Sequence, residues 1–384
     1  MLTPYLNKAR VVSALQQAAV LGVVALVLFL LAHNASLNLK ALNIASGFDF
    51  LSQRAGYDIS FKLIDFTPND SYSRAYAVGL LNTLLVSGMS IVLATLLGLA
   101  LGLAKVSRNW LISRLASSCI EFLRNVPLVV HVVWWYALAL ALPAVKQSVS
   151  FFSVAFLNNS GLILPWPTQG ALVGWGLLLM CIGVLAAWLV CRVRESRSPY
   201  RGFAQKRWPW MLAGAVLLPV CIYVVSGASW QWEVPVQRGF GFKGGVVLVP
   251  ELLALWLALS FYSASYIAEI VRGAIESVHR GQYEAAQALG FEHGKSMRQL
   301  IVPQAVYPMI PQVTNTYLNI VKNSSLGVVI GFMELVSSTG GTTLNQTGQA
   351  IECIALVMAT YCVISLLISV SMNIYNHRIG QRGH

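Results

Sequence analysis

Long apolar runs alternate with shorter polar stretches along this chain, and most of the runs are as long as a membrane-spanning helix. A helix needs about 20 mostly apolar residues to cross the hydrocarbon core of a bilayer. The pattern predicts eight spans at residues 11–31, 75–104, 117–142, 171–191, 209–226, 246–271, 306–332 and 351–375. The sequence therefore predicts an all-α polytopic membrane protein with about eight transmembrane helices.

The polar segments between these spans differ in character. Residues 34–73 form a long polar loop, residues 143–169 an aromatic loop typical of a membrane interface, and residues 230–245 a turn-rich loop. The most basic stretch, residues 192–207, is expected to hold the fourth and fifth spans at anionic lipid headgroups. The first apolar run is longer than the apolar region of a signal peptide and no small-residue cleavage site follows it, so we expect an uncleaved anchor.

Composition supports a membrane protein and excludes several other classes. The chain of 384 residues is 57% hydrophobic and 10% charged, which leaves too few charges to cover a soluble globule of this size. The net charge of +12 comes from basic residues that flank the apolar runs, so we expect contact with membrane lipids and no nucleic acid partner. The six cysteines contain no C-x-x-C pair, so neither a metal site nor a disulfide is expected.

The distribution of Lys and Arg predicts the orientation. With both termini in the cytoplasm, eighteen of the 26 basic residues lie on the inner side and seven on the outer side, and Lys322 lies within a span. Positive charge is enriched in cytoplasmic loops. The loop between the sixth and seventh spans is therefore predicted to be cytoplasmic.

That loop, residues 282–303, is a polar island between two apolar runs. Strong helix formers fill Gln282–Leu289, Gly290 suits a positive φ that ends a helix, and a helical pattern resumes at His293. The sequence predicts a helix, a turn and a second helix. Small residues at 285, 286 and 288, with Leu289, give the first helix a face with little relief. Such a face can fit into a groove of another protein.

The same loop resembles the EAA loop of the membrane subunits of ABC importers, through Glu284, Ala285 and Ala286, then Gly290, then Ile301–Pro303. In that family the short helix is the coupling helix, which docks on a cytoplasmic ATPase. The resemblance implies coupling residues at Glu284, Ala285, Ala286, Leu289 and Gly290. The alternative is an ordinary amphipathic loop between two spans.

Two further motifs resemble the polar amino-acid class of these permeases. Glu121, Arg124 and Pro127 match its E-x-x-R-x-x-P entry to a span, and Lys322–Leu326 with Glu334 match its K-x-S-S-L and downstream Glu. The resemblance covers residues 75–142 and 246–378, a five-helix core. The additional spans are similar to the larger-type permeases of bacterial general L-amino-acid importers.

This resemblance implies both a domain organisation and partners. Residues 1–74 would form an anchor helix and a periplasmic loop, residues 75–142 the first part of the core, residues 143–245 an insertion, and residues 246–384 the rest of the core with the coupling loop. The implied partners are an ABC ATPase dimer, a second related permease, a periplasmic amino-acid-binding protein and the amino-acid substrate. ATP and Mg would be used by the ATPase, no cofactor or metal by this chain, and the location is the bacterial inner membrane.

A polar stripe follows one face of the seventh predicted span, at Gln312, Asn315, Asn319, Lys322 and Asn323 with Thr316. A charge deep in a span costs about 2.5–3.5 kcal/mol on insertion scales, so Lys322 should face protein or water. One interpretation is a substrate pathway, since a Lys and amides suit the carboxylate of an amino acid. The other is helix packing, with Lys322 reaching the membrane surface or pairing with Glu334 or Glu352.

Other motifs favour structural roles. Glu121 and Arg124 lie one turn apart and are expected to form a local ion pair at the start of the third span, with a gate as the alternative. His131 is expected to be a hydrogen-bonding residue of the helix bundle. Residues 290–296, GFEHGKS, miss the P-loop spacing by one residue, and residues 239–244, GFGFKG, lie in an outer loop and are read as a Gly-rich connector.

The sequence thus favours a non-catalytic transmembrane subunit of an ATP-driven amino-acid importer. An ion-gradient-driven secondary transporter is the alternative, but it predicts inverted repeats and acidic residues at mid-membrane, and neither is evident. A membrane-embedded enzyme would need a polar catalytic cluster, which the sequence does not suggest.

Overall fold

The computed structural model describes residues 3–41, 47–167, 232–239 and 241–380. Its contacts divide the chain into two compact units, Met1–Val133 with Leu255–His384, and Trp134–Ala254. The predicted fourth and fifth spans and the basic stretch 192–207 lie outside the described residues.

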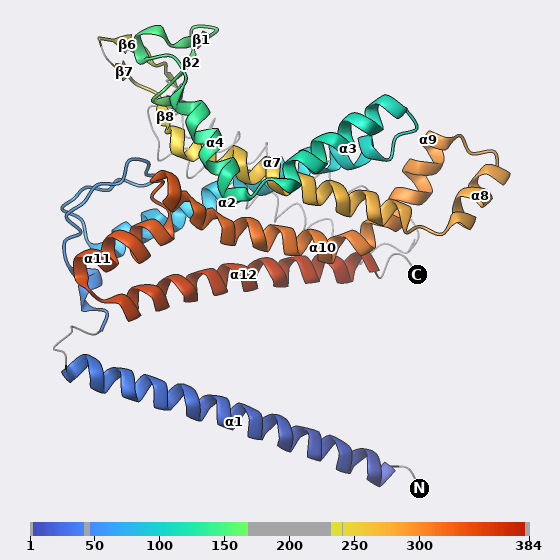
Figure 1. Cartoon of the computed structure of the whole chain (residues 1–384), viewed down its shortest axis with the longest axis horizontal. Coiled ribbons are helices and arrows are strands. Elements are labelled where there is room, and N and C mark those ends of the chain that lie inside the picture. Colours follow the sequence, from blue (N-terminus) through green and yellow to red (C-terminus); the bar gives the residue numbers. More distant parts are fainter. Residues whose placement is uncertain (1–2, 42–46, 168–231, 240, 381–384) are drawn as a thin grey trace, which may run out of the picture. The chain divides into compact units, whose positions relative to one another are not determined.

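The first unit consists mainly of long helices (Figure 1). The helices that lie in it wholly or in part are α1 (Thr3–Ala41), α2 (Tyr72–Lys105), α3 (Trp110–Asn125), α4 (Leu128–Leu140), α7 (Pro250–Glu276), α8 (Arg280–Ala288), α9 (His293–Ser296), α10 (Val302–Asn323), α11 (Leu344–Thr347) and α12 (Ala350–Gly380). Helix α10 packs along α12 and also contacts α2. Irregular helical turns at Asp49–Ser52, Met297–Ile301, Ser324–Ile330 and Val336–Thr343 complete this unit.

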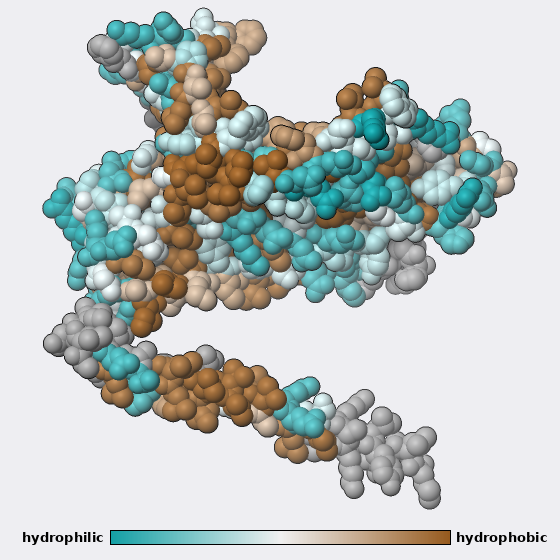
Figure 2. Space-filling view, in the orientation of Figure 1, coloured by the Kyte–Doolittle hydropathy of each residue, from teal (hydrophilic) through white to brown (hydrophobic). Residues whose placement is uncertain are grey.

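Within the described residues, three helices are long and apolar enough to cross a membrane: α2, α7 and α12. The pair α3 and α4 would make a fourth span if both belong to one crossing. Helix α1 contains a shorter apolar segment, Leu15–Leu31, and Figure 2 shows hydrophobic side chains over its middle. The prediction of several spanning helices is confirmed, whereas the described residues do not reproduce a count of eight.

Close packing of α2 against α7 forms part of the core. A Cβ added to Gly98 would lie 2.6 Å from the Cβ of Ile267 and 2.9 Å from the carbonyl oxygen of Ala264. Glycine at this position lets the two backbones approach closely, as small residues do between membrane helices. A buried cluster that includes Ala94, Ile267 and Ile301 continues this contact toward the loop that follows α7.

The segment between α1 and α2 packs on the ends of α2 and α12. Phe50 and Phe66 are buried against Tyr72 and Cys353. The backbone N–H of Gly47 donates a hydrogen bond of 2.8 Å to Oε1 of Glu352, in the first turn of α12. Of the polar loop predicted between the first two spans, residues 34–41 continue α1, and residues 47–71 form a layer with its own apolar contacts.

The third predicted span is not one continuous helix, which corrects the sequence prediction for residues 117–142. Helices α3 and α4 meet at Val126–Pro127 with a bend of 102°. Pro127 has no N–H to donate and disfavours helical backbone at the preceding residue. Val126 accordingly adopts an extended conformation, with φ −91° and ψ 130°.

The second unit contains strands, so the expectation of an all-α fold is wrong for its described residues 149–167, 232–239 and 241–248. An antiparallel four-stranded sheet has the order β1 (Val149–Phe151), β2 (Ala155–Asn158), β3 (Gly161–Leu164), β8 (Val246–Leu248). Two smaller antiparallel pairs join β4 (Trp166–Pro167) to β5 (Trp232–Glu233) and β6 (Val236–Arg238) to β7 (Gly241–Lys243). Aromatic and β-branched residues suit such strands, and the sequence analysis had assigned them to interfacial and turn-rich loops.

Two other predicted spans have different limits from those expected. The sixth begins as strand β8, and its helix starts only at Pro250. The seventh ends its regular helix at Asn323, after which Ser324–Ile330 forms a 3-10 turn. Apolar runs alone do not separate a strand or a 3-10 turn from the helix beside it.

Candidate functional site

The loop after α7 has the predicted helix–turn–helix form. Helix α8 begins after His279, whose Nδ1 accepts a hydrogen bond of 3.1 Å from the N–H of Gly281. Gly290 ends the helical segment with φ +77°, and its N–H donates 2.9 Å to the carbonyl of Gln287. Helix α9 and a π-helical turn at Met297–Ile301 then lead directly into α10.

Helix α8 is fixed to the end of α7 on one side. Ala286 is 1% exposed, and Tyr283 packs against the buried cluster around Ile275. The Tyr283 hydroxyl donates a hydrogen bond of 3.2 Å to the carbonyl of Ile275. Burial raises the pKa of this hydroxyl above its usual value, and the nearby Glu276 charge raises it further. Any displacement of α8 thus acts on the last turns of α7.

The other side of α8 is open. Among the five predicted coupling residues, Glu284, Ala285, Leu289 and Gly290 are exposed, with Leu289 at 75%. Ala286 differs because it faces inward and seats the helix instead of sharing the exposed face. An ion pair of 3.5 Å between Arg280 Nε and Glu284 Oε1 lies on this surface. The visible face around α8 and α9 is mostly hydrophilic (Figure 2).

A charged row joins α2 to α7 near this loop. Lys105, at the end of α2, bonds Oε1 of Glu269, and Nε of Arg272 bonds the other oxygen of Glu269 at 2.9 Å. Arg272 also pairs with Glu276. This row was not among the predicted site residues. The spacing of Glu269, Arg272 and Glu276 by three and four residues is the signal that could have found its α7 part.

The polar stripe of α10 lies on an exposed face of this chain. Gln312, Asn315, Asn319 and Lys322 are exposed, and Asn323 is half-buried. The hydrogen bonds recorded for this helix face are local, such as Gln312 Nε2 to the carbonyl of Pro308 at 3.4 Å. The stripe is therefore exposed and faces none of the helices that the structure describes.

Lys322 does not pair with either carboxylate that the sequence offered. Among the described residues, Glu334 accepts from the backbone N–H groups of Val336 and Ser337, both at 2.8 Å, and from the Tyr361 hydroxyl at 3.2 Å. Glu352 accepts from the N–H of Gly47. The two carboxylates hold backbone segments in place, so pairing with Lys322, one option within the packing interpretation, is not found.

The predicted ion pair at Glu121 and Arg124 is also wrong. Both residues are exposed on α3, and the guanidinium of Arg124 lies 5.2 Å from the ring centre of Tyr266 on α7. This cation–π contact links α3 to α7 just before the bend at Pro127. His131 is buried and its Nε2 lies 3.1 Å from the carbonyl oxygen of Leu123, which confirms its predicted role as a hydrogen-bonding residue of the bundle.

Comparisons with known proteins identify the family of this arrangement. A family model described as binding-protein-dependent transport system inner membrane component matches residues 208–382. The putative amino-acid ABC transporter permease protein YhdX of Escherichia coli (strain K12) is 46% identical over 366 residues, which cover 95% of this chain and 93% of YhdX. The chain belongs to this permease family.

Two further relatives match the permease along most of its length. The general L-amino acid transport system permease protein AapQ of Rhizobium johnstonii is 42% identical and covers 94% of the permease and 90% of AapQ. The glutamate/glutamine/aspartate/asparagine transport system permease protein BztB of Rhodobacter capsulatus is 35% identical, with 93% and 92% covered. The permease is therefore an inner-membrane transport component.

Proposed function

We propose that this permease is the transmembrane subunit of an ATP-driven amino-acid importer. It forms half of the translocation pathway and couples to a cytoplasmic ATPase dimer. A second related permease forms the other half, and a periplasmic amino-acid-binding protein delivers the substrate. The proposal rests on the family, on the printed names of the relatives, and above all on the exposed, glycine-ended helix α8.

The proposed topology has eight spans and places both termini in the cytoplasm. This topology is supported by the positive-inside rule, because it places most Lys and Arg residues on the cytoplasmic side. The partner ATPase binds and uses ATP and Mg. This chain converts the resulting movement of α8 into a movement of α7 and α10. The ion-gradient alternative is not favoured, because the relatives are named as ABC transporter permeases.

The coupling role of α8 can be tested at Gly290. A valine there would have to adopt φ +77°, which costs an L-residue about 1–2 kcal/mol, although an added Cβ meets no atom within 4 Å. We expect Gly290→Val to reduce substrate uptake at least tenfold while the complex still hydrolyses ATP. Uptake and hydrolysis are measured on the same proteoliposomes of the purified complex.

The matched control is Gly290→Asn, because asparagine tolerates positive φ better than valine. This variant should retain most of the coupled uptake. Normal uptake per ATP in Gly290→Val would remove the support for α8 as the coupling helix.

A further inference from the structure

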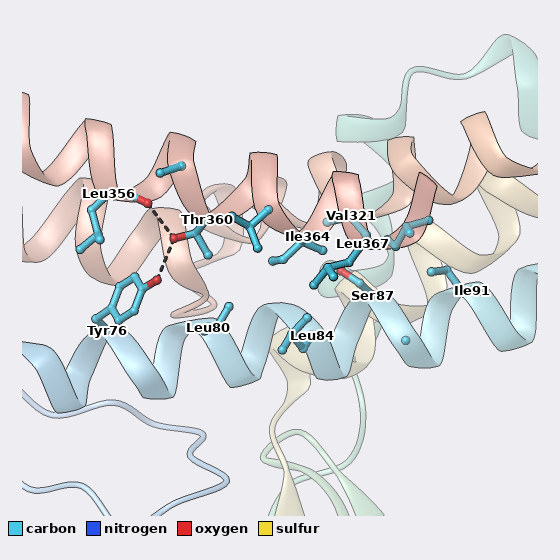
Figure 3. Close-up of a pocket in the computed structure, with 14 residues that line it drawn as sticks. Tyr76, Leu80, Leu84, Ser87, Ile91, Val321, Leu356, Thr360, Ile364 and Leu367 are labelled. Carbon is cyan, nitrogen blue, oxygen red and sulfur yellow. Dashed lines mark hydrogen bonds between the residues drawn. The ribbon is translucent and has the colours of Figure 1, made fainter. Parts of the chain in front are cut away.

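An apolar groove of about 690 Å³ lies between α2 and α12. Leu80 and Leu84 of α2 project toward Ile364 and Leu367 of α12 (Figure 3). At one end, the hydroxyls of Tyr76 and Thr360 bond each other at 2.7 Å, so they satisfy each other inside an apolar surface. Only 28% of the apolar window of α2 and 11% of that of α12 are buried, so both helices offer surface for another element.

The chain itself places a helix end beside this groove. The segment after α1 is fixed to both flanking helices, through the bond from Gly47 to Glu352 and through the cluster of Phe50 with Tyr72 and Cys353. Six steps of chain separate Ala41, the last residue of α1, from Gly47. They reach at most about 20 Å. The end of α1 is therefore tethered to the end of the groove that carries Tyr76 and Leu356.

Helix α1 has the composition that such a groove accepts. Its segment Leu15–Leu31 is apolar apart from Gln16 and Gln17 near its start, and its described side chains there are exposed. Ala14, Ala18, Gly22 and Ala25 recur at four- and three-residue steps, a small-residue face that permits close approach between membrane helices. On the wall of the groove, Gly88 of α2 also leaves space, because an added Cβ there would meet nothing within 4 Å.

We propose that α1 of the same chain occupies the groove between α2 and α12, antiparallel to α12. The direction rests on the proposed topology, in which α1 runs outward and α12 runs inward. A short tether raises the effective concentration of α1 at the groove far above that of any other helix in the membrane. The apolar segment of α1 is about 25 Å long, and the α2 wall from Tyr76 to Ile91 is about 22 Å.

Cysteine cross-linking in native membranes tests this placement, with the full chain expressed together with its partners. In a background without the six native cysteines, Leu30→Cys is combined with Ala359→Cys, which lines the groove. Leu30 lies eleven residues before the end of α1 and Ala359 nine residues after the start of α12, which gives similar depths of about 14–16 Å. We expect a short bifunctional maleimide to link them within one chain.

The control pair combines Leu30→Cys with Met358→Cys, which is 66% exposed and does not line the groove. Its yield should be at least fivefold lower. Mass spectrometry of the linked peptides, after separation of single from doubled chains by size, distinguishes the outcomes. A link between two chains would assign the groove to a second polypeptide, and equal yields for both pairs, or none for either, would assign it to lipid; each result overturns the proposal.

Filling the groove provides a second arm. Gly88→Phe should lower the Leu30–Ala359 yield at least fivefold, because the ring takes the space that α1 needs. Ala100→Phe, on an exposed part of α2 outside the groove, should leave the yield unchanged. An unchanged yield in Gly88→Phe overturns the proposal. Uptake that proceeds without ATP in the unlinked double-cysteine chain would instead count against the proposed function and leave the placement of α1 untouched.

Discussion

At the scale of single residues, Lys322 is the side chain whose role the subunit leaves open. It is exposed on the same side of α10 as Gln312, Asn315 and Asn319, and Glu334 and Glu352 form hydrogen bonds with other groups. An exposed ammonium beside amides suits either a substrate carboxylate or polar groups of the second permease. In the part of the chain that the structure describes, neither of these carboxylates pairs with Lys322.

For a pathway role we expect Lys322→Ala to raise the apparent KM for the transported amino acid about tenfold, which corresponds to about 1.4 kcal/mol. A lost charge-assisted hydrogen bond has this order of energy. Lys322→Arg should retain part of the affinity because it keeps the positive charge. Uptake kinetics in proteoliposomes give the KM. If only the amount of assembled complex falls and KM stays constant, the residue serves packing between subunits.

Glu334 is a second informative residue, since its side chain is 0% exposed and accepts three hydrogen bonds. Glu334→Ala would leave two backbone N–H groups without their acceptor. Each such buried group costs about 1–3 kcal/mol. We expect a clearly lower midpoint of thermal unfolding in detergent. We expect a smaller decrease for Tyr361→Phe, which removes the bonds to Glu334 and Ser324 but leaves both backbone N–H groups paired. Equal midpoints for Glu334→Ala and the parent protein would contradict this assignment.

How far the sequence predicts the site depends on whether the determining contacts are local. Gly290 and the helix formers before it define the loop at residues 282–303 locally, so the helix, turn and helix were predictable. Glu334 and Lys322 lie only twelve residues apart, yet their partners depend on how α10 and α12 fold against each other. The inward turn of Ala286 likewise depends on Tyr283 and the end of α7, which composition does not reveal.

At the scale of elements, the contact between α2 and α7 depends on the absence of side chains. Gly98 brings α2 to within van der Waals distance of Ile267 and of the backbone at Ala264. We expect Gly98→Leu to lower the unfolding midpoint, since overpacking costs about 1–3 kcal/mol or more. Gly88→Ala on the same helix, where an added Cβ meets nothing within 4 Å, is the control and should not destabilise. Comparable midpoints for the two variants would contradict this packing.

The elements also show where periodicity was insufficient. The long apolar runs of α2 and α12 have one simple interpretation, and the structure confirms them as helices. The run 117–142 has the length of a span, but Pro127 divides it into two helices. In the second unit, β1, β2 and β3 pair across short turns, but β8 joins this sheet from about 80 residues away. Such long-range pairing has no local signature beyond β propensity.

At the scale of the whole molecule, the exposed surfaces call for partners. Purification in mild detergent is expected to recover an ABC ATPase and a second permease with this chain. Leu289→Asp should lower the recovered ATPase several-fold, because it places a charge on the exposed apolar tip of the coupling segment, and should leave the second permease bound. Asn345→Asp, exposed on α11, is the control. Full transport by the lone chain would refute the assembly.

The charged row of Lys105, Glu269, Arg272 and Glu276 has a mechanical consequence. It fastens the end of α2 to the same turns of α7 that hold Tyr283 of α8 through Ile275. If a motor protein moves α8, the movement would therefore reach α2 and α7 together from its start. The two helices would tilt as one rigid pair, and α7 alone would not bend.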